Sequence, residues 1–128
     1  MNYNARYNVK NPYQGKNKKV LCLCSAGLLR SPTLAWVLSQ EPYNYNTRSA
    51  GVNEEYALIN LSSLLIHWAT DIICVNEDIR NQFWAFVEDN KEDMLGKAVI
   101  TLNIPDRFAY RDPELIEIIK TQYNEAIS

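Results

Sequence analysis

Two side chains six positions apart, Cys24 and Arg30, form the part of the sequence with the clearest chemical capability. A deprotonated cysteine is a strong nucleophile, and a guanidinium binds phosphate through two parallel hydrogen bonds. The residues between them are Ser25, Ala26, Gly27, Leu28 and Leu29. Gly27 permits the left-handed backbone of a tight loop, whose inward N–H groups bind anions. The segment therefore predicts a loop that holds a phosphate group and aims a sulfur at its phosphorus.

The residues after Arg30 predict a helix, with Ser31 as its N-cap and Pro32 at its first position. The positive end of that helix favours both a bound phosphate and the thiolate of Cys24. We also expect the Ser31 hydroxyl to hydrogen-bond the thiolate and stabilise it when sulfur leaves phosphorus. Because the single histidine, His67, lies on another predicted helix, loop amides and Arg30 are expected to activate the thiol.

Alternating strands and helices must position this loop. Strands are expected at 19–24, 44–49, 71–75 and 97–102. Helices are expected at 31–40, 57–69, 77–90 and 113–126. Apolar runs predict the buried strands, and apolar residues at helical spacing predict the helices. This alternation predicts an α/β fold with a parallel sheet, helices on both faces, and a ligand beyond the carboxyl ends of the strands.

The composition is that of one globular domain, with 128 residues, 47% hydrophobic and 22% charged. No apolar run is long enough for a membrane span, and the N-terminus lacks the apolar centre of a secretory signal. The odd cysteine count, with Cys22 and Cys74 beside Cys24, predicts reduced thiols in a cytoplasm. A net charge of −2 and a pI near 5.4 make nucleic acid an unexpected partner.

The charge is unevenly distributed along the chain. Residues 1–19 carry Arg6, Lys10, Lys16, Lys18 and Lys19 and no acid, whereas the remainder carries 15 acidic side chains. We expect 1–18 to be a basic, flexible arm and 19–128 to be the α/β domain that carries the predicted phosphate-binding loop. The arm is interpreted first as a solubilising tail and alternatively as a grip on an acidic partner.

The chain resembles the low-molecular-weight protein tyrosine phosphatases, especially the short ones predicted in bacteria and phages. The family signature is a cysteine, five residues and then Arg-Ser, as at 24–31. The segment 48–51 resembles the Ser-Ala-Gly after the family's second strand, and 71–76 resembles its third strand. The segment 104–106 resembles the late Pro-Asp that supplies the family's general acid. The likeness spans about residues 19–126 in the family's order.

Some positions depart from that pattern. The family's loop usually carries Gly-Asn where this chain has Ala26 and Gly27, so side-chain bracing by the asparagine is absent. Leu29 occupies the place of a second cysteine, so a loop disulfide is unavailable. The two tyrosines that follow the family's acid are replaced by Phe108 and Tyr110 in a looser spacing.

The resemblance implies a phosphomonoesterase for aryl phosphates, above all phosphotyrosine, acting through a cysteinyl-phosphate. Asp106 would be the general acid, while Asp112 is explained as the cap of the last helix. Tyr56, Phe108 and Tyr110 are expected to line the mouth of the site. The expected architecture has three layers, with a four-stranded parallel sheet in the order 2-1-3-4. No metal or other cofactor is expected, because loop amides and Arg30 supply the positive charge.

Alternatives stay open. The substrate could be a nucleotide or another small phosphate instead of a phosphotyrosine protein. An arsenate reductase of similar fold would need a further pair of cysteines near the third strand, where only Cys74 occurs. A phosphate-binding module without catalysis would have no use for Asp106. The expected partner is a phosphorylated substrate, with no membrane, and the expected state is a monomer.

Overall fold

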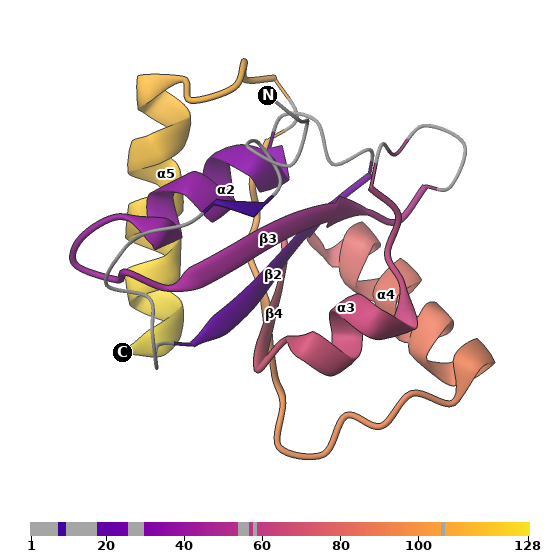
Figure 1. The fold of residues 1–128 in the computed structure, drawn as a ribbon. Helices are drawn as coiled ribbons and strands as arrows, with labels where there is room; N and C mark the ends of the chain where they lie inside the picture. The colour runs from indigo at the N-terminus through magenta and orange to yellow at the C-terminus, as the bar shows by residue number, and fades with distance from the viewer. Residues whose placement is uncertain (1–7, 10–17, 26–29, 54–56, 58, 106) are drawn as a thin grey trace.

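The computed structural model describes the whole chain except residues 1–7, 10–17, 26–29, 54–56, 58 and 106. The strands are β1 Asn8–Val9, β2 Lys19–Cys24, β3 Asn46–Gly51, β4 Asp71–Cys74 and β5 Ala98–Thr101. The helices are α2 Arg30–Ser39, α3 Ser63–Trp68, α4 Glu77–Asn90 and α5 Pro113–Ile127. The described strands form one sheet in the order β1-β3-β2-β4-β5 (Figure 1).

Four strands of the sheet are parallel and have the expected order. Counted without β1, the sequence order across the sheet is 2-1-3-4, because β2 pairs with β3 and β4, and β4 pairs with β5. The predicted α/β fold with a parallel sheet is therefore confirmed. The short β1 adds an antiparallel strand beside β3 with Asn8 opposite Arg48, a pairing that the sequence did not predict.

The helices cover the sheet on both faces. Figure 1 shows α2 and α5 together on one side of the sheet and α3 and α4 on the other. Alternate side chains of β3 reach the two layers, because successive residues of a strand point to opposite faces. The Thr47 hydroxyl donates to the Ala35 carbonyl of α2 at 2.8 Å, and the Arg48 guanidinium lies 4.3 Å from the Trp68 ring centroid of α3.

The core lies around the two central strands. Residues 20–24 of β2 and the whole of β4 are buried, as predicted for strands that are covered on both faces. Phe83 of α4 and Tyr123 of α5 are the largest fully buried side chains and fill the two opposite layers. By contrast, β5 at the sheet edge is half-buried or exposed along its length.

Two predicted helix boundaries were wrong. The helix expected at 57–69 begins only at Ser63, because the chain before it runs beside the end of β3. There Gly51 N–H donates to the Ile59 carbonyl and Leu61 N–H donates to the Gly51 carbonyl. Leu61 thus becomes buried from an extended segment, although its spacing fitted a helix.

The second correction concerns the start of α2. This helix begins at Arg30, so Ser31 lies in its first turn rather than at the N-cap. The physical reason is that the Ser31 hydroxyl is turned toward the sulfur of Cys24 and not toward the helix backbone. Asp112 caps α5 as predicted and accepts from the Glu114 N–H, and Asn76 caps α4 by accepting from the Ile79 N–H.

Candidate active site

Cys24 ends β2 at the carboxyl edge of the sheet, where the chain turns toward α2. Its side chain is 3% exposed, and its Sγ lies 3.1 Å from Oγ of Ser31. The register places Val20 opposite Thr47, so residues 20, 22 and 24 point toward the α2 layer. Strand and helix together therefore aim the sulfur at the first turn of α2, and the positive end of that helix lies beside it.

Backbone hydrogen bonds hold the start of the loop. The Cys24 carbonyl accepts from Val52 N–H at 3.0 Å, and the Ser25 carbonyl accepts from Asn53 N–H at 2.8 Å. These bonds continue the pairing with β3 beyond the last residue of each strand. The thiol is thus carried on backbone whose position is fixed by a neighbouring strand, which restricts the directions the sulfur can take.

Several predicted site residues lie outside the described residues. These are Ala26, Gly27, Leu28, Leu29, Tyr56 and Asp106. Arg30 is described only as the first residue of α2. Their assigned roles therefore stay predictions. What the structure brings together is Cys24, Ser25 and Ser31, with the backbone of Arg30 directly before Ser31.

The three cysteines occupy different environments. Burial raises the pKa of the Cys22 thiol well above its usual range, and the neighbouring sulfurs of Cys24 and Cys74 raise it further. Burial also raises the pKa of Cys74 to about 12, although the nearby Arg80 guanidinium partly opposes this shift. Both thiols are therefore protonated core groups near neutral pH, as expected from the sequence. No disulfide joins the three.

The segment around position 106 is anchored on both sides. Ile104 N–H donates to the Val75 carbonyl at 2.9 Å, and Ile104 itself is buried. The Phe108 ring is 5% exposed and packs in the core, with the Arg107 guanidinium 4.2 Å from its centroid. Arg107 also bridges to Glu114 at 2.8 Å. The described residues on either side of position 106 are therefore anchored at the carboxyl side of the sheet.

A second connection joins this segment to α2. Arg111 N–H donates to Oγ1 of Thr33 at 2.8 Å, and its guanidinium lies 4.4 Å from the ring centroid of Trp36 and 4.9 Å from that of Tyr110. Thr33 is fully buried one turn after the start of α2. Sequence reasoning missed Thr33 and Arg111, although a polar residue at a buried position of this helix was a usable signal.

Asp112 is occupied as a helix cap. Its carboxylate accepts the Glu114 N–H at 2.9 Å, and Pro113 begins α5. This confirms the interpretation of Asp112 from the sequence. In the described part of the chain there is also no group of three or more His, Cys, Asp or Glu side chains suited to a metal ion. Nor does that part contain a helix that could cross a membrane.

Solved structures of known proteins are similar to this architecture. No family model and no curated protein matches the chain. Among solved structures, the tyrosine phosphatase Wzb from Escherichia coli is 15% identical with a TM-score of 0.61, covering 85% of this chain and 95% of that one. The YwlE arginine phosphatase from Geobacillus stearothermophilus is 19% identical with a TM-score of 0.55, covering 85% of each chain.

An arsenate reductase is also similar. The thioredoxin-dependent enzyme from Corynebacterium glutamicum is 16% identical with a TM-score of 0.56, covering 90% of this chain and 61% of that one. A low-molecular-weight phosphotyrosine phosphatase from Vibrio cholerae is found as well. The chain therefore has the α/β fold of the low-molecular-weight tyrosine phosphatases, which agrees with the resemblance in its motifs.

Proposed function

We propose that the protein is a phosphomonoesterase that hydrolyses aryl phosphates, most of all phosphotyrosine, through a cysteinyl-phosphate. The observation that carries the proposal is the position of Cys24 at the carboxyl end of β2, with its sulfur 3.1 Å from the Ser31 hydroxyl at the start of α2. Strand end, anion-binding helix terminus and nucleophile coincide there. The similar structure of a tyrosine phosphatase supports this activity, and that of an arginine phosphatase supports phosphatase chemistry in general.

In the first step, the Cys24 thiolate attacks phosphorus and forms a sulfur–phosphorus bond. The bond between phosphorus and the leaving oxygen breaks, and Asp106 gives its proton to that oxygen. The loop amides of residues 25–29 and the Arg30 guanidinium bind the three equatorial oxygens, where charge is concentrated in the transition state. The sequence motif assigns these roles. Arg30 is suited to binding phosphate because its planar guanidinium can donate two parallel hydrogen bonds to two phosphate oxygens.

In the second step, water attacks the phosphorus of the intermediate. Asp106, now a carboxylate, accepts the proton of that water. The sulfur–phosphorus bond breaks, its electron pair returns to Cys24, and inorganic phosphate is released. The hydroxyl of Ser31 donates a hydrogen bond to the departing thiolate, and this contact lowers the cost of restoring the anion in a buried position.

The experiment is a comparison of phosphate release from phosphotyrosine peptides, nucleotides and sugar phosphates, with wild type and Cys24→Ser. We expect release from the aryl phosphate and none from Cys24→Ser, because the site offers a serine no base to ionise it. Cys74→Ala is the matched control and should keep its activity, since Cys74 is a buried core thiol. After acid quench, labelled phosphate should be found on Cys24, and labelling of another residue would contradict the mechanism.

Arsenate reduction is the second candidate, because one similar structure has that activity. That reaction needs further accessible thiols to accept the oxidised sulfur. Cys22 and Cys74 are fully buried and their pKa values are raised, so neither is suited to this task. A thioredoxin-coupled arsenate assay should therefore show no turnover. Vanadate binding without any phosphatase turnover would instead identify a phosphate-binding module.

The setting we propose is a monomer in the cytoplasm that acts on a phosphorylated substrate. Free cysteines fit a reducing compartment. Residues 1–18 are proposed to be a basic arm, of which Asn8 and Val9 pair with β3 at the edge of the sheet.

A further inference from the structure

The outer edge of β5 carries backbone groups that have no partner among the described residues. In a parallel ladder, alternate residues direct N–H and C=O toward the same neighbour. Ala98 N–H donates to the Thr70 carbonyl at 3.1 Å, and Leu102 N–H donates to the Cys74 carbonyl at 2.8 Å. Val99 and Thr101 therefore direct their backbone groups outward. Within the described residues, no strand lies beyond β5.

Asn103, two residues beyond the end of β5, also directs its backbone groups outward, and there they are paired. The Asn103 N–H donates to Oε1 of Gln122 at 2.6 Å, and Nε2 of Gln122 donates to the Asn103 carbonyl at 2.8 Å. The side-chain amide from α5 thus makes both hydrogen bonds that a peptide group of an added strand would make. The pairing ends the open edge at Asn103 and leaves Val99 and Thr101 as the available positions.

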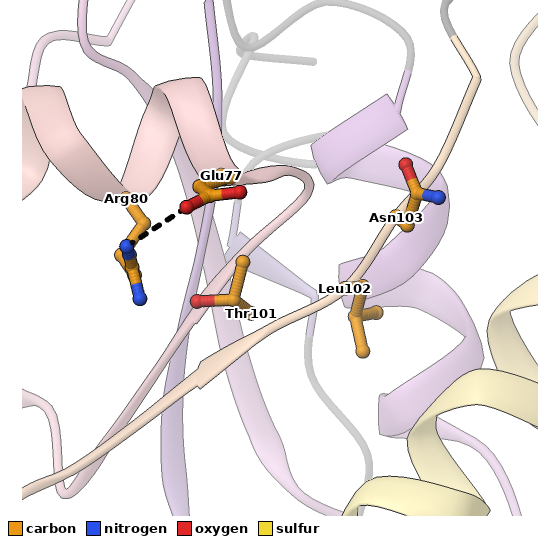
Figure 2. Close-up of a pocket in the computed structure, with 5 residues that line it drawn as sticks. All are labelled: Glu77, Arg80, Thr101, Leu102 and Asn103. Atoms are coloured by element: carbon orange, nitrogen blue, oxygen red, sulfur yellow. Dashed lines mark hydrogen bonds and ion pairs between the residues drawn. The ribbon is translucent and has the colours of Figure 1, made fainter.

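Two hollows flank the same end of this edge. One, of about 420 Å³, is lined by Glu77 and Arg80 of α4 together with Thr101, Leu102 and Asn103 (Figure 2). The other, of about 490 Å³, is lined by the same three residues together with Gln122, Glu125 and Ala126 of α5.

The hollows belong to opposite faces of the sheet. Figure 2 shows the Thr101 side chain on the side of Glu77 and Arg80, and the Leu102 side chain directed away from them. Because side chains of an extended strand alternate between faces, a strand added to β5 would direct successive side chains toward the two hollows in turn.

We propose that the outer edge of β5 binds an extended segment of the phosphorylated polypeptide, as an added strand beside Val99 and Thr101. The inference rests on the proposed function and narrows its substrate class to polypeptides. Leu23, Cys74 and Thr101 are in register, so the docking edge ends level with the nucleophile. At about 5 Å per strand, the added segment lies about 15 Å from β2, so a few residues separate it from the phosphotyrosine.

A second copy of the chain fits this edge less well. If two β5 strands paired antiparallel about Ile100, the partner's Val99, Ala98 and Lys97 would lie opposite Thr101, Leu102 and Asn103 of the hollows. The Lys97 ammonium already donates to the backbone carbonyls of His67 and Ala69 of its own chain. Ala98, opposite Leu102, has only a methyl group, so the hollow on the α5 side would stay unfilled.

The test compares Thr101→Pro with Thr101→Val. Proline removes the outward N–H and places its ring at the edge, yet the inward ladder with β4 does not use that N–H. Valine keeps the N–H and the β-branched shape. The substrates are free phosphotyrosine and a degenerate peptide pool of about eleven residues, about 35 Å when extended, with phosphotyrosine at its centre.

We expect wild type to prefer the peptide pool in kcat/KM and Thr101→Pro to lose about tenfold on the pool, with free phosphotyrosine unchanged. Thr101→Val should match wild type on both substrates. Equal kcat/KM for the pool in wild type and Thr101→Pro would overturn the docking proposal. So would a dimer in wild type that becomes a monomer in Thr101→Pro, because the edge would then bind a second copy.

A substrate-side measurement needs no variant. Methylation of the backbone nitrogens outside the phosphotyrosine removes the peptide's donors, so wild type should lose its preference for the pool. An unchanged preference would contradict strand addition. Failure of the proposed function has a different result, since wild type would then hydrolyse neither the pool nor free phosphotyrosine.

Discussion

The two ends of the sheet use polar side chains in opposite ways. At the amino end, Tyr43, Tyr45 and Tyr123 pack ring against ring, with centroids 5.4–6.2 Å apart. The Tyr123 hydroxyl donates to that of Tyr45, and burial raises the pKa of Tyr123 above its usual range. Lys18 bridges to the buried Asp71 at 3.3 Å. Tyr123 with Tyr45 and Lys18 with Asp71 thus satisfy one another at this end.

At the carboxyl end, the strands instead end in loops that carry the proposed chemistry. Cys24 faces Ser31, and the segment after β5 is held to α2 through Thr33 and Arg111. A rigid scaffold with functional loops separates stability from activity. We therefore expect changes at the amino end to alter mainly the free energy of unfolding, and changes at the carboxyl end to alter mainly turnover.

The largest expected effect is on activity, from Arg30→Lys. The charge is kept, but a compact ammonium cannot form two parallel hydrogen bonds to phosphate. We expect kcat/KM for phosphotyrosine to fall by about a thousandfold, or about 4 kcal/mol, with the thermal midpoint unchanged. Arg107→Lys is the matched control, because Arg107 forms an exposed ion pair with Glu114, and it should remain near wild type. If Arg30→Lys and Arg107→Lys had similar kcat/KM values, Arg30 would not be the residue that binds the phosphate.

The second largest expected effect is on stability, from Tyr123→Ala at the amino end of the sheet. Removal of a fully buried ring should lower the free energy of unfolding by about 3 kcal/mol, because surrounding side chains only partly close the cavity. Denaturant unfolding measures this loss, and kcat of the remaining folded protein should stay near wild type. Tyr123→Phe keeps the ring and removes one hydrogen bond to Tyr45, so it should cost only about 1 kcal/mol. A loss of kcat in folded Tyr123→Ala would show that the two ends are coupled.

Most of the fold could be predicted from the sequence because its signals were local. Central strands are buried on both faces and read as continuous apolar runs, as in β2 and β4. The helix α4 was predicted with its observed ends, since the apolar residues Ile79, Phe83 and Val87 recur at helical spacing. The helix at 57–69 was overestimated because its first part is fixed by backbone pairing with Gly51, which leaves no local signal.

The site was predictable to a different degree. The motif placed Cys24 and Ser31 together without any coordinates, because the spacing between a strand end and a helix start fixes their proximity. The contacts that anchor the site were not predictable, since Asn53 and Ile104 act through backbone N–H groups that any residue could supply. The open edge of β5 required the strand order, which is a property of the whole sheet.

A smaller effect should distinguish Asp106 from Asp112. A good leaving group departs without a proton, so general-acid catalysis matters most for a poor one. Asp106→Asn should slow phosphotyrosine hydrolysis about a hundredfold and hydrolysis of an activated aryl phosphate much less. Asp112→Asn should act mildly on both, because asparagine still accepts the Glu114 N–H. A leaving-group-dependent loss in Asp112→Asn alone would reassign the acid.

The smallest expected effect is on the free energy of unfolding, from deletion of the N-terminal arm. Deletion of 1–15 removes β1, whose pairing with Thr47 and Arg48 protects the outer edge of β3. Two residue pairs contribute few hydrogen bonds, and ordering the arm costs entropy, so the loss of unfolding free energy should stay below about 1 kcal/mol. Deletion of 1–7 alone keeps β1 and is the matched control.

Both truncations should hydrolyse a small aryl phosphate as wild type does, because Thr47 and Arg48 lie in the half of β3 away from Cys24. A selective loss of turnover in the longer truncation would mean that the arm contributes to the site.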